Sequence, residues 1–265
     1  SEQSVEGWEI ESNPADAIVT LKEGKRARAA GTDVNTYYMG LTAEDFTAVS
    51  PNYKTVTVRY TDGWLKITPI TDEVTVTITG NTDTVVYNGS EQSVTGYTTD
   101  VGEKAIDVTL NQSGKDTAKG TNVGKYMMGL TVADFTVTSG NYSNIRVVVV
   151  DGWLEITPIT DEVEVKVYGN TNTVVYNGTE QKVEGYTVDA TLDPTITVSL
   201  AEGSKAEAKG TDVNKYMMGL TAADFVAASA NYTNLKITVV DGWLEITPVT
   251  GEITVTITGN TDTVV

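Results

Sequence analysis

The chain of 265 residues has 36 acidic and 18 basic side chains, and its net charge of −18 repels phosphate backbones and anionic lipid, so no nucleic-acid partner is expected. It contains no cysteine and no histidine, which excludes disulfides, thiol nucleophiles, imidazole bases and the usual zinc sites. No apolar run of about 18 residues and no signal peptide occur, so we expect no membrane insertion in this segment and a mature soluble segment or an excised piece.

The sequence is built from three similar copies. The segment Ser-Glu-Gln-Ser-Val at residue 1 recurs at residue 90 and, as Thr-Glu-Gln-Lys-Val, at residue 179, so the spacing is 89 residues. Trp64, Trp153 and Trp243, each within Asp-Gly-Trp-Leu, keep this spacing with one additional residue in the third copy. Solenoid units are only about 20 to 50 residues long, so each copy predicts a small domain with its own core.

The first elements of a copy are predicted strands. Residues 74–79 alternate β-branched apolar and threonine side chains, which is typical of a strand with one buried face. A turn at 80–83 and a second strand over 84–87 follow. Asn88-Gly89 then supplies the residues that a type I′ hairpin turn requires. We therefore expect each repeat to begin with a hairpin.

The later elements of a copy are also short strands. Residues 147–150 and 153–156 flank Asp151-Gly152, which predicts another hairpin. Residues 130–135 favour a single helical turn. Thr131 would cap this turn, and the Asp134 side chain would accept a hydrogen bond from the Thr131 backbone in return. The repeated Thr-Pro at residues 68, 157 and 247 marks the exit from a last strand and a short, stiff connection. These patterns predict an all-β fold, a tandem array of small Ig-like β-sandwich domains forming an elongated rod.

Several of these turn and strand motifs occur together in order. They are Tyr87-Asn88-Gly89, Gly-Thr-Asn-Val-Gly-Lys-Tyr at 120–126, Asn141-Tyr142 and Asp-Gly-Trp-Leu-Glu-Ile-Thr at 151–157. In this respect every copy resembles the MBG and YDG-type repeats of bacterial surface proteins. The resemblance implies an extracellular, β-rich module at the bacterial cell surface, strung in tandem in large adhesins to place a binding head away from the cell wall. It carries no catalytic residues.

The same resemblance implies where the domains begin and end. Residues 71–159 and 160–249 would be complete repeats, residues 1–70 a first repeat without its N-terminal hairpin, and residues 250–265 the N-terminal hairpin of a following repeat. A rival phase begins domains at Ser1, Ser90 and Thr179, so that 90–178 is one domain. Periodicity alone does not choose between them.

Aromatic residues are the candidates for ligand contact. Trp64, Trp153 and Trp243, with Tyr126 and Tyr216, would face a ligand if they line one surface of every copy. The alternative is that these rings pack in the core or in an interface, as a tryptophan inside an alternating strand usually does. Their burial distinguishes the two interpretations.

No cofactor, metal site or enzyme activity is expected. A junction calcium site would draw on eight residues, but no Asp-x-Asp-x-Asp-Gly loop exists and Asp72 is replaced by Gly251 in the last copy, so solvated turns are the simpler account. The eight are Asp72, Glu73, Asn81, Asp83, Asp161, Glu162, Asn170 and Asn172. Nothing marks a catalytic carboxylate pair.

Two functions remain after these exclusions. The first is a structural stalk or fibre segment of a bacterial cell-surface adhesin. The second is an array of weak mucin- or glycan-binding modules, or modules for another host or environmental ligand, that act by avidity. For the first, we also expect copies of the chain to join head to tail, since the tail with Ile253, Val255, Ile257 and Val264 matches the hairpin that residues 1–70 lack. A fragment cut from a longer array, or the rival phase, would explain the same ends without association.

Overall fold

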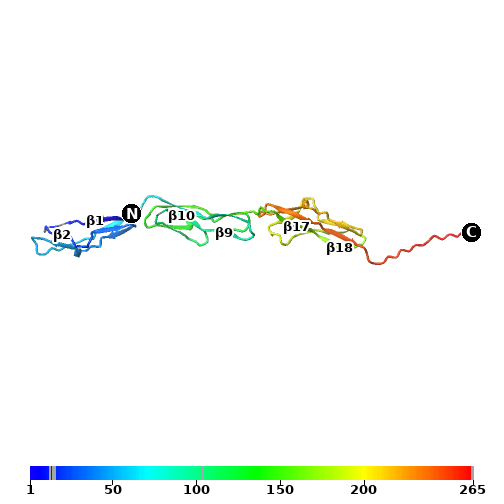
Figure 1. Ribbon diagram of the computed structural model, residues 1–265, viewed down its shortest axis with the longest axis horizontal. Coiled ribbons are helices and arrows are strands. Elements are labelled where there is room, and N and C mark those ends of the chain that lie inside the picture. Colours follow the sequence, from blue (N-terminus) through cyan, green and yellow to red (C-terminus); the bar gives the residue numbers. More distant parts are fainter. Residues whose placement is uncertain (12, 14–15, 103, 264–265) are drawn as a thin grey trace. The chain divides into compact units, whose positions relative to one another are not determined.

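The computed structural model describes residues 1–11, 13, 16–102 and 104–263. In these ranges the regular structure consists of short β-strands and three single turns of 3-10 helix (Figure 1). None of the helical turns in the described ranges has the length and apolar character that a membrane span requires. The prediction of an all-β fold is confirmed.

The chain divides into two compact units. The first comprises Ser1–Thr82, Val94–Ala118 and Met127–Trp153, and the second comprises Asp83–Ser93, Lys119–Tyr126 and Leu154–Val265. The first repeat therefore lies in the first unit and the third repeat in the second unit. The second repeat contributes strands to both.

The strands recur at corresponding places in the three copies. In the first copy they are β1 (Gln3–Glu6), β2 (Ile18–Leu21), β3 (Arg28–Gly31), β4 (Asn35–Tyr38), η1 (Ala43–Asp45), β5 (Phe46–Val49) and β6 (Trp64–Ile67). In the second they are β7 (Val74–Gly80), β8 (Thr82–Val86), β9 (Gln92–Thr95), β10 (Tyr97–Asp100), β11 (Asp107–Leu110), β12 (Thr117–Gly120), β13 (Gly124–Met127), η2 (Val132–Asp134), β14 (Phe135–Thr138), β15 (Ile145–Val150) and β16 (Trp153–Thr157). In the third they are β17 (Val163–Gly169), β18 (Thr171–Val175), β19 (Gln181–Glu184), β20 (Tyr186–Val188), β21 (Thr197–Leu200), β22 (Glu207–Gly210), β23 (Asn214–Met217), η3 (Ala222–Asp224), β24 (Phe225–Ala228), β25 (Leu235–Val240) and β26 (Trp243–Thr247).

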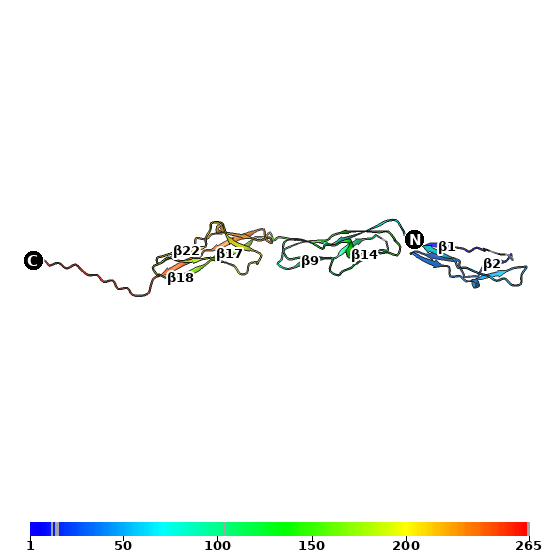
Figure 2. The same cartoon turned by 180° about the vertical axis from the view of Figure 1, so that it is seen from behind.

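The third repeat shows the complete sandwich within one unit, and Figure 2 labels its strands β17, β18 and β22. One three-stranded sheet has the order β20-β17-β25 and the other the order β18-β26-β23. β17 runs parallel to β25, and β18 runs parallel to β26. Two antiparallel pairs, β19-β22 and β21-β24, complete the fold. This is the Ig-like β-sandwich that the sequence predicts.

The expected hairpins are wrong. β17 and β18 follow one another closely, yet they belong to different sheets, and the same is true of β25 and β26 on either side of Asp241-Gly242. The chain crosses from one sheet to the other at Asn170. The backbone N–H of Asn170 donates to the Gly185 carbonyl, and the backbone carbonyl of Asn170 accepts a hydrogen bond from the Trp243 N–H. Asn81 makes the same two bonds, to Gly96 and from Trp153. In the second and third repeats the opening segment is therefore a strand that changes sheet, and residues 88–89 and 151–152 are connections between sheets.

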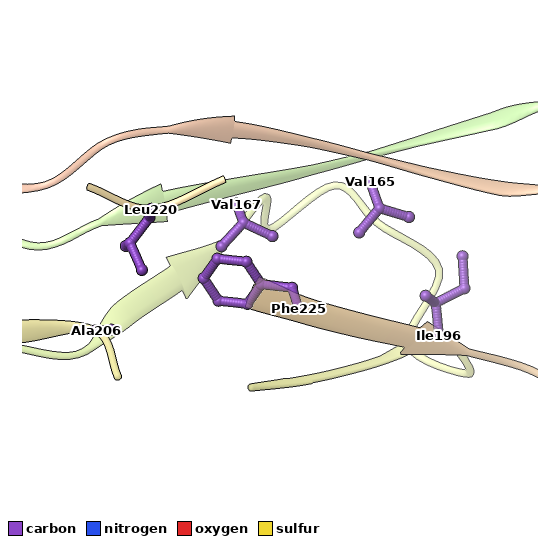
Figure 3. Packing of buried hydrophobic residues seen from close by; sticks show 6 residues of the cluster. All are labelled: Val165, Val167, Ile196, Ala206, Leu220 and Phe225. Carbon is purple, nitrogen blue, oxygen red and sulfur yellow. The ribbon is translucent and has the colours of Figure 1, made fainter. Parts of the chain in front are cut away.

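The core of the third repeat comes from the alternating pattern of β17. Val165 and Val167 are fully buried, and they pack with Ile196, Leu220, Phe225 and Ala206 from surrounding elements (Figure 3). A second cluster consists of Ala208, Leu244 and Ile246. Each such valine or leucine stabilises the fold by about 1.5–3 kcal/mol relative to an exposed side chain. β17 is thus the strand on which much of the core is built.

The predicted helical turn is present as η2, one turn of 3-10 helix. The Thr131 N–H and hydroxyl both donate to Asp134 Oδ2, at 2.7 and 2.8 Å. These bonds hold the chain as it enters β14, whose Phe135 is buried. The arrangement recurs with Thr42 and Asp45 in the first repeat.

The first repeat differs from the other two in its strands. Residues 8–11 and 55–61 form no strand, although they align with β10 and β15 of the second repeat. In the second repeat both of these strands pair with β7. Among the described strands of the first repeat, none pairs with either of these two segments.

Candidate functional site

One asparagine in each of two repeats holds a turn of the repeat before it. In the first unit the Val34 N–H donates to Asn141 Oδ1 at 2.9 Å, and Asn141 Nδ2 donates to Asp33 Oδ1 at 2.9 Å. Asp33 and Val34 lie between β3 and β4, and Asn141 lies between β14 and β15. The side-chain amide of Asn141 thus both accepts and donates a hydrogen bond across the junction of the first and second repeats.

The junction of the second and third repeats has the same bonds, inside the second unit. The Val123 N–H donates to Asn231 Oδ1 at 2.8 Å, and Asn231 Nδ2 donates to Asn122 Oδ1 at 3.0 Å. Asn231 is only 2% exposed. Because a buried amide that loses its partners is costly, these bonds fix the position of the turn.

The connecting segments are also bonded to the repeat that follows. The Ile70 N–H donates to the Asn141 carbonyl at 2.9 Å, and the Ser143 N–H donates to the Ile70 carbonyl at 3.0 Å. Ile159 makes the equivalent bonds with Asn231 and Thr233, at 2.9 and 3.0 Å. Each isoleucine therefore forms a short parallel bridge, and the residues after the Thr-Pro motif are not a free linker.

A half-buried carboxylate, Asp193, adds to the second junction. The hydroxyls of Tyr87, from the second repeat, and of Tyr232, from the third, each donate to Asp193 Oδ2 at 2.9 Å. The Thr195 N–H and hydroxyl donate to Asp193 Oδ1 at 2.8 and 2.6 Å. Tyr87 is 5% exposed, whereas the corresponding Tyr176 of the third repeat is 39% exposed.

The charges of this cluster follow from its bonds. Burial by itself raises the pKa of Asp193, but the hydrogen bonds from Thr195, Tyr232 and Tyr87 outweigh it and hold that pKa at about 2. Burial, together with the facing carboxylate, raises the pKa of Tyr232 to about 12. The cluster is thus a fixed carboxylate between two neutral phenols, which suits a structural contact and leaves no group ready to exchange a proton near neutral pH.

A tyrosine hydroxyl bonds to the turn between two strands in both the second and the third repeat. The Tyr126 hydroxyl donates to the Asn122 carbonyl at 2.8 Å, and the Tyr216 hydroxyl donates to the Asp212 carbonyl at 3.0 Å. The Tyr126 ring covers Gly120 so closely that a Cβ there would overlap the ring, and Tyr216 covers Gly210 in the same way. These two predicted ligand-facing residues are half-buried. Tyr126 holds the Asn122-Val123 turn, which bonds to Asn231, and Tyr216 holds the corresponding turn of the third repeat.

The three tryptophans do not form a common exposed face. Trp153 and Trp243 are half-buried, and Lys215 Nζ lies 4.0 Å from the centre of the Trp243 ring. Trp64 is 56% exposed; among the described strands, its strand β6 pairs with β4 alone, whereas β26, which carries Trp243, pairs with both β18 and β23. Since Tyr216 lies opposite Leu244 and Met217 opposite Trp243, Tyr216 and Trp243 project from opposite faces of their sheet.

The first repeat contains an open groove of about 770 Å³. Its walls include Trp8 and Ile10 on one side, Val56 and Val58 on the other, and Phe46. These walls are the two segments that form no strand. The groove therefore lies along the unpaired edges of the first repeat.

The tail that follows β26 forms no strand in residues 250–263, and its residues are exposed (Figure 1). Ile253, Val255 and Ile257 are 84%, 73% and 89% exposed. The fourth residue of the expected donated strand, Val264, lies outside the described residues. An apolar β-pattern in solvent is unusual, since such side chains are normally buried.

The residues considered for calcium act as ordinary turn residues. Asn81 Nδ2 donates to the Thr95 carbonyl at 2.9 Å, and Asn170 Nδ2 donates to the Glu184 carbonyl at 2.8 Å. Glu162 forms an ion pair of 3.0 Å with Lys236. In the described part of the chain, no three acidic, histidine or cysteine residues gather as metal ligands would.

Sequence reasoning missed the junction asparagines as a site. The signal was an asparagine at residues 52, 141 and 231, each before a tyrosine, in all three copies. Asn141-Tyr142 stood out only as part of a family motif. Asp193 gave no signal, since the second copy has Glu103 and the first Pro14 in the aligned position.

No family model matches the chain, and no curated protein matches it. Among solved structures, the N-terminal four Ig domains of Dscam1 isoform 6.9 match at 12% identity over 86% of this chain and 56% of that chain, with a TM-score of 0.22. The same four domains of Dscam1 isoform 9.44, solved with zinc, match at 12% identity over 90% of this chain and 57% of that chain, with a TM-score of 0.20. The chain thus spans a little over half the length of either match. Scores this low support no inference about function.

Proposed function

We propose that this chain is a structural segment of an extracellular stalk or fibre at the bacterial cell surface. The observation that carries the proposal is the recurrence of one asparagine junction, with the same two side-chain bonds, between the first and second repeats and between the second and third. A protein whose repeats only need to be tethered does not require an asparagine bonded across each junction. Repeats that must keep a fixed angle to one another do require such a contact.

Two further features support this function. The connecting isoleucines are hydrogen-bonded to the following repeat, so bending at the Thr-Pro motif is restricted. The net charge of −18 keeps such a segment soluble and apart from other anionic surfaces. The resemblance to MBG and YDG-type repeats of adhesins accords with both.

The alternative function, a repeated glycan-binding module, requires an exposed ring at the same position of each copy. Among the described residues, no aromatic position is exposed in all three repeats. We therefore place the stalk function first, and a glycan array probed with the whole chain would test the alternative.

Small-angle scattering from the whole chain tests the stalk function. The proposal predicts an extended particle whose maximum dimension falls when Asn141→Ala and Asn231→Ala are combined, because the junctions then bend. The matched control is Asn52→Ala, since Asn52 holds the same position in the first repeat but is exposed. A compact wild-type particle, or equal scattering from wild type and the double variant, would contradict the proposal.

A further inference from the structure

The strands that begin the third repeat run parallel to the strands that end it. The chain enters this repeat through β17 and β18 and completes it with β25 and β26. β17 pairs in parallel with β25 in one sheet, and β18 pairs in parallel with β26 in the other. The other strand pairs described in this repeat are antiparallel. The two parallel ladders therefore join the entry of the repeat directly to its exit.

Backbone hydrogen bonds extend both ladders beyond the ends of the strands. Before β17, the Ile159 N–H donates to the Asn231 carbonyl at 2.9 Å, and the Thr233 N–H donates to the Ile159 carbonyl at 3.0 Å. After β18, the Tyr176 N–H donates to the Thr247 carbonyl at 2.9 Å. The entry and exit segments are thus bonded to each other from Ile159 to Tyr176, except where the chain changes sheet.

Side chains add further bonds between the same pairs of strands. The Thr238 hydroxyl of β25 donates to Glu164 Oε1 of β17 at 2.9 Å. The Thr247 hydroxyl of β26 donates to the Val174 carbonyl of β18 at 3.1 Å. β17 and β26 also carry the most deeply buried side chains of the two core clusters of this repeat. The strands that connect the repeat to the rest of the chain are therefore its most firmly held strands.

Tension along the chain loads these ladders in shear. It pulls the entry strands toward their N-terminal end and the exit strands toward their C-terminal end. Because the paired strands are parallel, they are pulled past each other along their length, and the bonds of a ladder are stretched together. An antiparallel pair pulled at its adjacent ends opens one bond at a time instead. A single hydrogen bond contributes only about 0.5–1.5 kcal/mol, so a ladder resists strongly only when its bonds must break together.

We propose that the repeats bear tension through their parallel entry and exit strands, which act as a mechanical clamp. The second repeat has the same device: β7 runs parallel to β15, and the Tyr87 N–H donates to the Thr157 carbonyl at 2.9 Å. The proposal rests on the stalk function, since a stalk passes tension from one repeat to the next. It adds resistance to unfolding within a repeat, which a fixed junction between repeats does not supply.

Pulling the third repeat in two directions with optical tweezers tests the proposal. The chain has no cysteine, so DNA handles can be attached to cysteines introduced at exposed threonines of the whole chain. Thr160→Cys with Thr250→Cys applies the force through β17 and β26 and loads the ladders in shear. Thr211→Cys with Thr250→Cys applies it at the adjacent ends of the antiparallel strands β23 and β26. At one loading rate, we expect the unfolding force to be about twofold or more higher in the first direction.

Two prolines in β18 test whether the ladder bonds bear the force. The register on β26, with the Trp243 N–H bonded to the Asn170 carbonyl, points the Asn172 N–H toward β26 and the Thr173 N–H away from it. Both side chains are exposed, and β18 is at the edge of its sheet. Asn172→Pro should therefore lower the unfolding force in the shear direction. Thr173→Pro is the matched control and should keep the force of the parent chain.

The two pulling directions compare the same folded repeat, so urea denaturation should give equal free energies of unfolding for the two cysteine variants. A difference in force between them then reflects the direction of loading and not stability. The proposal is overturned if both directions require the same force, or if Thr173→Pro lowers the force as much as Asn172→Pro. Bending at the junctions would change the scattering of the chain but not the force measured within one repeat, so failure of the stalk function is distinguishable.

Discussion

Asn231 Nδ2 donates a hydrogen bond of 3.0 Å to Oδ1 of Asn122, a residue 109 positions earlier in the chain. The same amide accepts a bond from the Val123 N–H. Its partners belong to a different repeat from its own, so its contribution to stability appears only when two repeats meet. Asn141 repeats the arrangement one period earlier.

The first prediction concerns this amide. Asn231→Ala should lower the free energy of unfolding by about 1–3 kcal/mol, because it removes two hydrogen bonds across the junction and leaves the half-buried Val123 N–H without its partner. Asn52→Ala, at the exposed equivalent in the first repeat, should change it by no more than about 0.5 kcal/mol. Urea denaturation of both variants measures the difference. Equal losses would show that the asparagine matters within its own repeat and not at the junction.

The second prediction concerns the carboxylate that links Tyr87 and Tyr232. The pKa of Asp193 in the folded chain, about 2, lies below its ordinary value of 3.8. Its stabilising effect is therefore fully present above about pH 4 and is lost as the pH falls through 2. The melting temperature of Asp193→Asn should lie below that of the wild type at pH 6, and the gap should close on acidification. The exposed control Asp161→Asn should show no such gap, and a gap for Asp193→Asn that stays constant down to pH 2 would refute the assignment.

The third prediction concerns the glycine under Tyr126. Gly120→Ala should destabilise the chain by about 1–3 kcal/mol, because the new Cβ overlaps the tyrosine ring and displaces the turn that it supports. Gly140→Ala is the control, since a Cβ there meets nothing within 4 Å. Thermal unfolding of the two variants compares them. If both melt like the parent, the ring does not hold the turn.

The fourth prediction concerns Gly152, where the structure gives a different reason for the need for glycine than the sequence does. The Asp-Gly pair suggests a hairpin with positive φ, but Gly152 is not among the positive-φ glycines. Gly152→Val should nonetheless destabilise the second repeat, because its Cβ would lie 2.5 Å from the Asn81 carbonyl oxygen. Hydrogen exchange should show the loss of protection at the Trp153 N–H, which donates to that carbonyl. Unchanged protection at Trp153 would mean that the backbone moves aside.

Local patterns identified the strands but not their partners. The alternation in residues 74–79 and the turn at Thr131 to Asp134 depend on neighbours in sequence, and both appear where they were expected. Sheet membership depends on residues far apart, which explains the wrong hairpins. Asn170 bonds to Gly185 and Trp243, and no local signal shows that these bonds carry the chain from one sheet to the other.

The candidate site shows the same limit. Tyr126 and Tyr216 were selected for their rings, but their position against Gly120 and Gly210 depends on neighbouring strands. The repeated asparagine was visible in the sequence, although its partners lie more than a hundred residues away.

The account depends most on a fixed junction between repeats, and a distance distribution across one junction tests this directly. The chain has no cysteine, so spin labels can be placed on cysteines introduced at the exposed Thr47 of the first repeat and Thr109 of the second. Electron-electron double resonance should give one narrow distance distribution, which broadens with Asn141→Ala and stays narrow with Asn52→Ala. A broad distribution in the parent chain, or one that Asn141→Ala leaves unchanged, would contradict the account.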